Sequence, residues 1–204
     1  MQSTALESAA QQSEMLDIVN ALYTSQVVER VQSHGVVVTR DYMAKAGAIP
    51  LPATFTIESG ERIGQRSKTG MLFRLYSDSP FRSRKDGGPR DDFERFALTD
   101  LRQNPDSPVY RFEAFHGRPS LRYATARRMQ ADCIGCHNND TNSTKRDWKV
   151  GDVGGVLEII RPLDRDIART REGLRGTFVL IAAVSGALLA TSGLVLVVPS
   201  RWLK

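Results

Sequence analysis

Residues 109–125 read VYRFEAFHGRPSLRYAT, and this stretch decides the fold class that we predict. Its two halves, 109–115 and 120–125, are rich in β-branched and aromatic residues, which favour strands. The polar HGRP between them (116–119) is typical of a tight turn. The stretch therefore predicts an antiparallel β-hairpin.

Other short segments have the same strand-like composition. They are ATFTIE (53–58), MLFRLYS (71–77) and VGGVLEII (153–160). Ahead of the first, Pro50 and Pro52 in AGAIPLPATF are expected to force extended backbone and to end any helix.

Two segments predict helices in this part of the chain. Residues 5–33 carry an apolar stripe with no Pro or Gly, formed by Leu16, Val19, Tyr23, Val27 and Val31. Residues 87–105 predict a helix that starts after Pro89, stops before Pro105 and buries Phe93, Phe96, Ala97 and Leu101. The expected fold class is α+β: a small antiparallel sheet with one cross-helix, preceded by a long helix.

The C-terminal part predicts a single membrane span. No residue of 176–200 is charged, and an apolar helix of about 20 residues crosses a bilayer. We expect a juxtamembrane helix at 162–175 and a short tail at 201–204. Leu163, Ile167, Thr170 and Leu174 are spaced 4-3-4, which fits either a seam with a partner helix, as in a homodimer, or a solvated linker.

The net charge of +5 does not indicate a nucleic-acid partner. Basic residues are mixed with acidic ones, without a Lys/Arg block interleaved with aromatic residues, so we expect no nucleic-acid binding. The N-terminus lacks the basic start and the apolar core of a signal peptide. We therefore expect a missing upstream export segment or a non-classical route to the membrane.

The sequence DCIGCHN (132–138) contains the chain's two cysteines, Cys133 and Cys136, followed directly by His137. Cys-x-x-Cys-His is the attachment motif of c-type haem. Two thiols at this spacing can add to the two vinyl groups of one haem, and the next imidazole can then reach the iron. The motif predicts one covalent haem c.

Three other chemistries compete for this motif. A tetrahedral zinc needs four ligands, and only His34 and His116 remain as nitrogen donors. A dithiol redox centre tends to open a helix in a βαβ context, whereas this motif follows a β-rich stretch and precedes a polar loop. A structural disulfide is the third alternative.

Haem attachment also predicts where the domain lies. Covalent attachment takes place outside the cytoplasm, so residues 1–161 should be extracytoplasmic, on the periplasmic side. The positive-inside rule predicts the opposite orientation, because residues 161–175 carry five arginines against Arg201 and Lys204 on the far side. We give the haem motif precedence in this conflict.

Four blocks around the motif resemble a known family: AIPLPATFTIESGERIG, YSDSPFRSRKDGGPRDDFERFAL, LRYATARRMQADCIGCHN and DWKVGDVGGVLEIIRPL. They are similar to a bacterial extracytoplasmic c-type haem sensor domain with a PAS-like fold. This domain is often found before a membrane helix and a histidine kinase or nucleotide cyclase.

The resemblance implies thioether bonds at Cys133 and Cys136, with His137 as the proximal iron ligand. It also implies that the sheet and the N-terminal helices wrap the haem. The sequence departs from the family pattern twice: we expect no output domain after the membrane helix, and no third cysteine is present for the distal ligand of some members.

The sixth iron ligand decides whether the iron binds gas or only exchanges electrons. The candidates are His34, which lies where some relatives place their ligand, and His116, Met43 and Met129. An open or water-filled position is the remaining alternative. We expect Arg122, Tyr123 and Trp148 to border the haem, since Arg pairs well with propionate carboxylates.

The sequence thus predicts a membrane-anchored monohaem cytochrome domain that senses redox state or gas. The alternative is an electron-transfer or accessory haem subunit of a larger respiratory or photosynthetic membrane complex. A third possibility is a truncated form of a longer cyclase or kinase. No residue set indicates a hydrolase or a transferase, so we expect no enzymatic activity; GDVGG precedes a strand and does not form a phosphate-binding loop.

Overall fold

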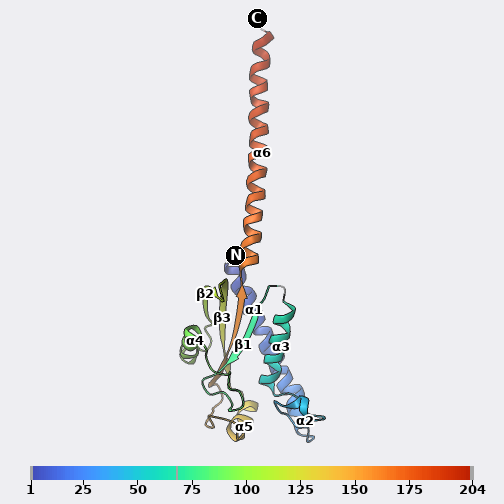
Figure 1. Cartoon of the computed structure of the whole chain (residues 1–204), viewed down its shortest axis with the longest axis vertical. Helices are drawn as coiled ribbons and strands as arrows, with labels where there is room; N and C mark the ends of the chain where they lie inside the picture. Colours follow the sequence, from blue (N-terminus) through green and yellow to red (C-terminus); the bar gives the residue numbers. More distant parts are fainter. Residues whose placement is uncertain (1, 68, 203–204) are drawn as a thin grey trace. The chain divides into compact units, whose positions relative to one another are not determined.

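The computed structural model describes residues 2–67 and 69–202 and has the predicted α+β class (Figure 1). N-terminal helices precede a four-stranded antiparallel sheet, and an apolar helix follows it. The chain divides into two compact units, residues 1–162 and 163–204. The division lies next to the boundary expected at residue 161.

The sheet has the strand order β1-β4-β3-β2, and every neighbouring pair is antiparallel. The strands are β1 (Leu72–Tyr76), β2 (Val109–Phe115), β3 (Arg118–Arg128) and β4 (Val153–Pro162). The β2–β3 pair is the predicted hairpin, with Val109 opposite Ala124. The register of β3 and β4 shifts between Arg127 and Arg128, which is a β-bulge beside Gly154.

Helix α4 (Asp92–Gln103) covers one face of the sheet. Its N-cap, Asp91, accepts a hydrogen bond from the Glu94 amide at 3.0 Å, as expected for an Asp at this position. The core between helix and sheet comprises Tyr76, Phe93, Ala97, Leu98, Leu101, Val109, Ala124 and Val156. The predicted burial of Phe96 is wrong: this side chain is 52% exposed, and Leu98 takes its place in the core.

Helix α1 (Gln2–Leu22) packs on the opposite face, against β3 and β4. Its buried residues are small except for the last, namely Ala5, Ala9, Ser13 and Leu16. The hydroxyl groups of Ser13 and Thr125 are 2.7 Å apart, which fixes the helix on β3. Because small side chains allow the backbone of α1 to come close to the sheet, the contact does not need a broad apolar stripe.

The long N-terminal helix is confirmed, but its predicted stripe is only partly buried. A π-helix, η1 (Tyr23–Val28), and a short helix, α2 (Glu29–Gln32), continue α1. Val19 and Val27 are each 39% exposed, whereas Val28 is buried. A π-turn contains more residues than an α-turn, so it rotates the inward face away from the spacing assumed for a regular helix.

Residues 53–58 were expected to form a strand, and this prediction is wrong. They belong to helix α3 (Pro52–Arg66), and Pro52 occupies its first turn, where a missing N–H has no cost. Helix α3 packs against β1; at Gly60 an added Cβ would lie 2.7 Å from the Cβ of Phe73. Pro52 therefore begins a helix rather than ending one.

The remaining elements are a short 3₁₀ turn, η2 (Tyr42–Ala44), and two helices, α5 (Ala131–Asn139) and α6 (Asp164–Trp202). Within α6, residues Asp164–Ser192 are long and apolar enough to cross a membrane, with a mean hydropathy of 1.7. The expected tail, 201–204, lies partly outside the described residues, which end at 202.

Candidate functional site

Helix α5 carries the Cys-x-x-Cys-His motif. Cys133, Cys136 and His137 occupy positions i, i+3 and i+4, which place the three side chains on one face of the helix. The sequence predicted only a β-rich stretch followed by a loop here. The loop expected at the motif was an argument against a dithiol redox centre, and the helix removes that argument. The flanking strands β3 and β4 are antiparallel, however, so the motif does not lie in the βαβ unit that is typical of such centres.

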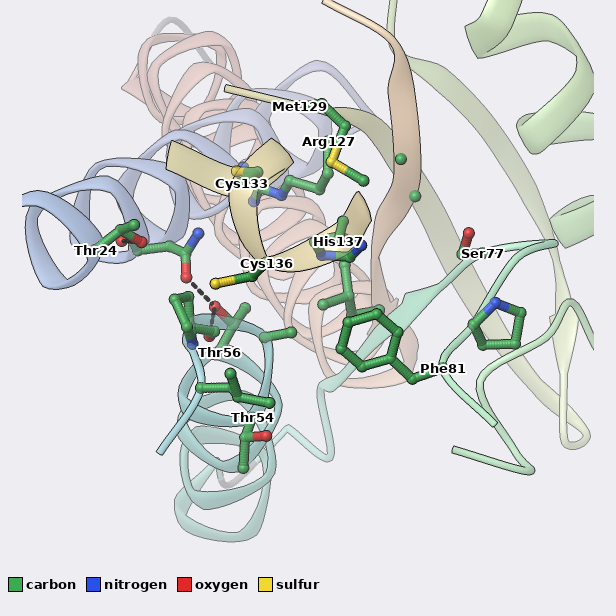
Figure 2. A pocket seen from close by; sticks show the side chains of 18 of the residues that line it. Thr24, Thr54, Thr56, Ser77, Phe81, Arg127, Met129, Cys133, Cys136 and His137 are labelled. Carbon is green, nitrogen blue, oxygen red and sulfur yellow. Dashed lines mark hydrogen bonds between the residues drawn. The ribbon is translucent and has the colours of Figure 1, made fainter. Parts of the chain in front are cut away.

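The motif face of α5 lines a cavity with a volume of about 230 Å³ (Figure 2). The opposite wall comes from the end of α1, η1 and the first turns of α3, including Thr24, Thr54 and Thr56. The loop after β1 contributes Phe81, and the β-bulge contributes Arg127 and Arg128. At β4 the wall is made by Gly154 and Gly155, which bring backbone to the cavity surface.

Both cysteines are free thiols. Cys133 is partly buried, and burial, assisted by Asp132, raises the pKa of its thiol to about 11. Cys136 is exposed at the cavity. A dithiol redox centre depends on a thiolate with a lowered pKa, so the environment of Cys133 does not favour that alternative.

His137 lies between two aromatic side chains. Its ring centroid is 4.8 Å from that of Phe81 and 6.4 Å from that of Trp148. Burial lowers the pKa of His137, which keeps the imidazole neutral near pH 7 with a nitrogen lone pair available to a metal.

Trp148 fixes the polar loop after the motif to α5. Its backbone N–H donates to the Asn138 side chain, and the Asn138 amide donates to the Trp148 carbonyl, both at 3.0 Å. The indole is buried and borders His137, as expected for a residue near the haem. These bonds orient the aromatic wall beside the imidazole.

The donor set fits a covalent haem better than a tetrahedral zinc. Two thiols and one neutral imidazole face one cavity, in the order that c-type attachment uses. Within the described residues, no group of three or more His, Cys, Asp and Glu side chains is gathered as for a metal ion. A preformed tetrahedral zinc site has four such ligands.

The candidate sixth ligands lie in different places. Met129 is buried and lines the cavity. His34 is exposed after α2, with Nδ1 2.8 Å from the Arg30 carbonyl oxygen. Met43 is 84% exposed, and His116 occupies the β2–β3 turn at a positive φ of 49°, stacked on Phe115. Of the four, the structure brings only Met129 to the cavity lining.

Arg122 points to the α4 side of the sheet and not into the cavity. It donates from Nε to Glu158 at 2.6 Å and from Nη1 to Asp91 at 2.7 Å and to Glu113 at 3.1 Å. Its guanidinium also lies over Phe93. Tyr123 is buried elsewhere in the sheet, and neither residue lines the cavity. The sequence could not show on which face of the sheet Arg122 and Tyr123 lie, because that depends on how β3 pairs with its neighbouring strands and on what packs on each face.

The π-helix is a part of the site that the sequence did not predict. Thr24 and Val28 of η1 line the cavity together with Asn20 near the end of α1, and Asn20 Oδ1 accepts a hydrogen bond from the Thr56 hydroxyl at 2.8 Å. Single π-turns inside α-helices occur frequently at functional sites. The Thr-Ser pair and the β-branched Val-Val within residues 23–28 are weak helix formers, which is the only local signal for this irregularity.

Comparison with known protein families gives a match that covers most of the chain. The model of the Tll0287-like family matches residues 2–162, which include every element described above except α6. No match was found among curated proteins or among solved structures.

Proposed function

Because the chain belongs to the Tll0287-like family, a family of haem-sensor-type domains, we propose that residues 1–161 form a PAS-like domain carrying one covalent haem c. The observation that carries this proposal is the placement of Cys133, Cys136 and His137 on one face of α5 against one cavity. The domain serves redox or gas sensing.

The residues of the chain have separate roles in this proposal. Cys133 and Cys136 form the thioether bonds, and His137 provides the proximal nitrogen. Phe81 and Trp148 hold the imidazole between them, so its orientation is set before the cofactor is attached. When bound, the haem supplies an iron that changes its oxidation state or takes a small ligand.

The cavity lining supports sensing over electron transfer. Beyond the motif, Met129 alone among the described lining residues carries a nitrogen or sulfur atom of the kind that ligates haem iron. The wall opposite α5 instead carries hydroxyl groups and an amide, from Thr24, Thr56 and Asn20. Such a wall suits water or a small exchangeable ligand at the sixth position.

The alternative function is that of an electron-transfer or accessory subunit in a larger membrane complex. The exposure of Cys136 favours it, because one edge of the attached haem would then lie near solvent and near a partner. Copurification in fixed stoichiometry with redox subunits would establish this alternative, whereas a homodimer alone would weaken it. In either function the domain binds haem and responds through the state of its iron, and we propose no catalytic activity.

We further propose that α6 anchors the protein in a membrane by a single pass, with the haem domain on the periplasmic side. The length and apolar composition of Asp164–Ser192 support the anchor. The requirement for extracytoplasmic haem attachment supports the orientation.

The test is a set of absorption spectra of the full chain purified from membranes: as isolated, reduced, and reduced with carbon monoxide. Sensing at an exchangeable position predicts that carbon monoxide shifts the bands of the reduced protein. Unchanged low-spin bands would contradict it and favour electron transfer. A Met129→Leu variant then shows whether Met129 was the blocking ligand, since only in that case does the variant bind carbon monoxide.

A further inference from the structure

Two arginines at the cavity lack a carboxylate partner. Arg40 donates to the Ser83 carbonyl, and Arg84 Nη2 donates to the Leu75 carbonyl at 3.2 Å. Both line the cavity, and among the described residues neither forms an ion pair. A bond to a neutral carbonyl satisfies a donor but leaves the positive charge uncompensated.

The other arginines of the cavity are paired. Arg127 is bonded to Asp17, and Arg128 is bonded to Asp106. The lining also includes the carboxylates of Glu29 and Asp132, but neither lies within ion-pair distance of Arg40 or Arg84 in the described structure. Among the described arginines that line the cavity, Arg40 and Arg84 are therefore the two without a carboxylate partner.

The environment of Arg84 makes this charge costly. Its side chain is partly buried, and burial together with the positive charges of Arg40 and Arg74 lowers its pKa. Two neighbouring guanidinium groups that repel each other are stabilised by an anion bound to both. A planar carboxylate fits this need, because guanidinium binds it through two parallel hydrogen bonds.

The loop after β1 holds Arg84 in a fixed position relative to the motif. The Arg84 N–H donates to the Phe81 carbonyl at 2.7 Å, and the Gly87 N–H donates to the Arg84 carbonyl at 3.0 Å. The same Phe81 packs on His137. One short loop thus positions both the neighbour of the proximal imidazole and the uncompensated guanidinium.

We propose that Arg84, together with Arg40, binds a propionate carboxylate of the haem. This inference rests on the proposed function. It replaces the expectation for Arg122, whose charge is already balanced by Glu158, Asp91 and Glu113 on the other side of the sheet. Arg40 is exposed and Arg84 partly buried, so the pair reaches from the surface into the cavity.

The pairing has a measurable consequence for the iron. A guanidinium bonded to a propionate offsets its negative charge, and removal of that guanidinium leaves the negative charge to stabilise the oxidised, more positive iron. The midpoint potential is therefore expected to fall in Arg84→Gln, to fall further in the Arg40→Gln/Arg84→Gln double variant, and to return toward the wild-type value in Arg84→Lys.

The experiment is a spectroelectrochemical redox titration of the full chain and these variants at one pH. Arg82→Gln is the matched control, because Arg82 lies in the same loop but is exposed and donates to the Thr141 carbonyl at 2.9 Å. Each variant is first checked for its haem content per chain and for its circular dichroism spectrum.

The expected result is a lowered potential in Arg84→Gln and an unchanged one in Arg82→Gln. Equal potentials in Arg84→Gln, the double variant and Arg82→Gln would overturn the propionate assignment while leaving the haem itself in place. If the wild-type chain carries no haem, the proposed function is wrong, and this inference falls with it.

Discussion

The chemistry of Glu158 depends strongly on its surroundings. It is fully buried in β4, and its Oε1 accepts the 2.6 Å bond from Arg122. Burial and the negative charges of Glu94 and Asp91 nevertheless raise its pKa from 4.5 to about 7. The carboxylates in this cluster outnumber the positively charged side chains close to them, so the cluster binds a proton more readily than an exposed Glu does.

The raised pKa predicts a pH-dependent stability. Between about pH 4.5 and pH 7 the folded state binds more protons at Glu158 than the unfolded state, so the free energy of unfolding falls as the pH rises through this range. Glu158→Gln keeps the shape and an acceptor for Arg122 but cannot titrate, and we expect it to lose this slope. Urea unfolding at several pH values measures the effect.

Glu61→Gln, on the exposed side of α3, is the control and should retain the wild-type slope. A slope that persists unchanged in Glu158→Gln would show that another group carries the proton.

At this scale the sequence predicts chemistry that is local and misses chemistry that depends on distant partners. Cys133, Cys136 and His137 are defined by their spacing alone, so the motif could be recognised before any fold was known. Arg122 and Arg84 look alike in the sequence. Only the tertiary structure shows that Arg122 is surrounded by carboxylates, whereas Arg84 has no carboxylate partner among the described residues.

At the scale of elements, four of the five segments predicted as strands from their β-branched and aromatic residues are strands, and the errors concern helices. The β-branched and aromatic residues of 53–58 indicated a strand. These residues form part of helix α3 because Pro52 begins the helix and because α3 packs against β1. Apart from Leu16, the buried residues of α1 are alanines and a serine, which a search for apolar stripes passes over. In α3 and in α1 the outcome depends on tertiary contacts, and local propensity carries no information about such contacts.

The close approach of α1 to the sheet predicts a strong effect of size at Ala9, which is completely buried. In Ala9→Leu the added carbons have no space, and overpacking of this kind costs about 1–3 kcal/mol. We expect a lower midpoint in thermal unfolding. Gln11→Leu, exposed on the same helix, should unfold at nearly the wild-type temperature; an equal loss in both variants would mean that α1 does not pack as described.

At the scale of the whole molecule, the chain combines a domain of the Tll0287-like family with an apolar helix. The two units are distinct in composition, and the sequence predicted both because an uncharged stretch of this length is a strong signal. Which side of the membrane the domain occupies remains a prediction, because the arginines of 161–175 and the haem motif indicate opposite orientations.

The membrane anchor predicts that the full chain sediments with membranes and needs detergent for release. A charge at the centre of a span costs about 2.5–3.5 kcal/mol on insertion scales, so Leu188→Arg should shift part of the protein out of the membrane fraction. In Thr177→Arg, near the end of the uncharged stretch 176–200 of which Leu188 is the centre, the charge can extend to the interface, so this variant should stay membrane-bound. Release of the wild-type chain by high salt alone would contradict a transmembrane anchor.

The central claim, a single haem held covalently by Cys133 and Cys136, is tested most directly by the intact mass of the denatured chain after expression with a cytochrome c maturation system. The account predicts a mass increased by one haem in the wild type and an unmodified mass in the Cys133→Ala/Cys136→Ala variant. An unmodified wild-type chain with two titratable thiols would contradict it.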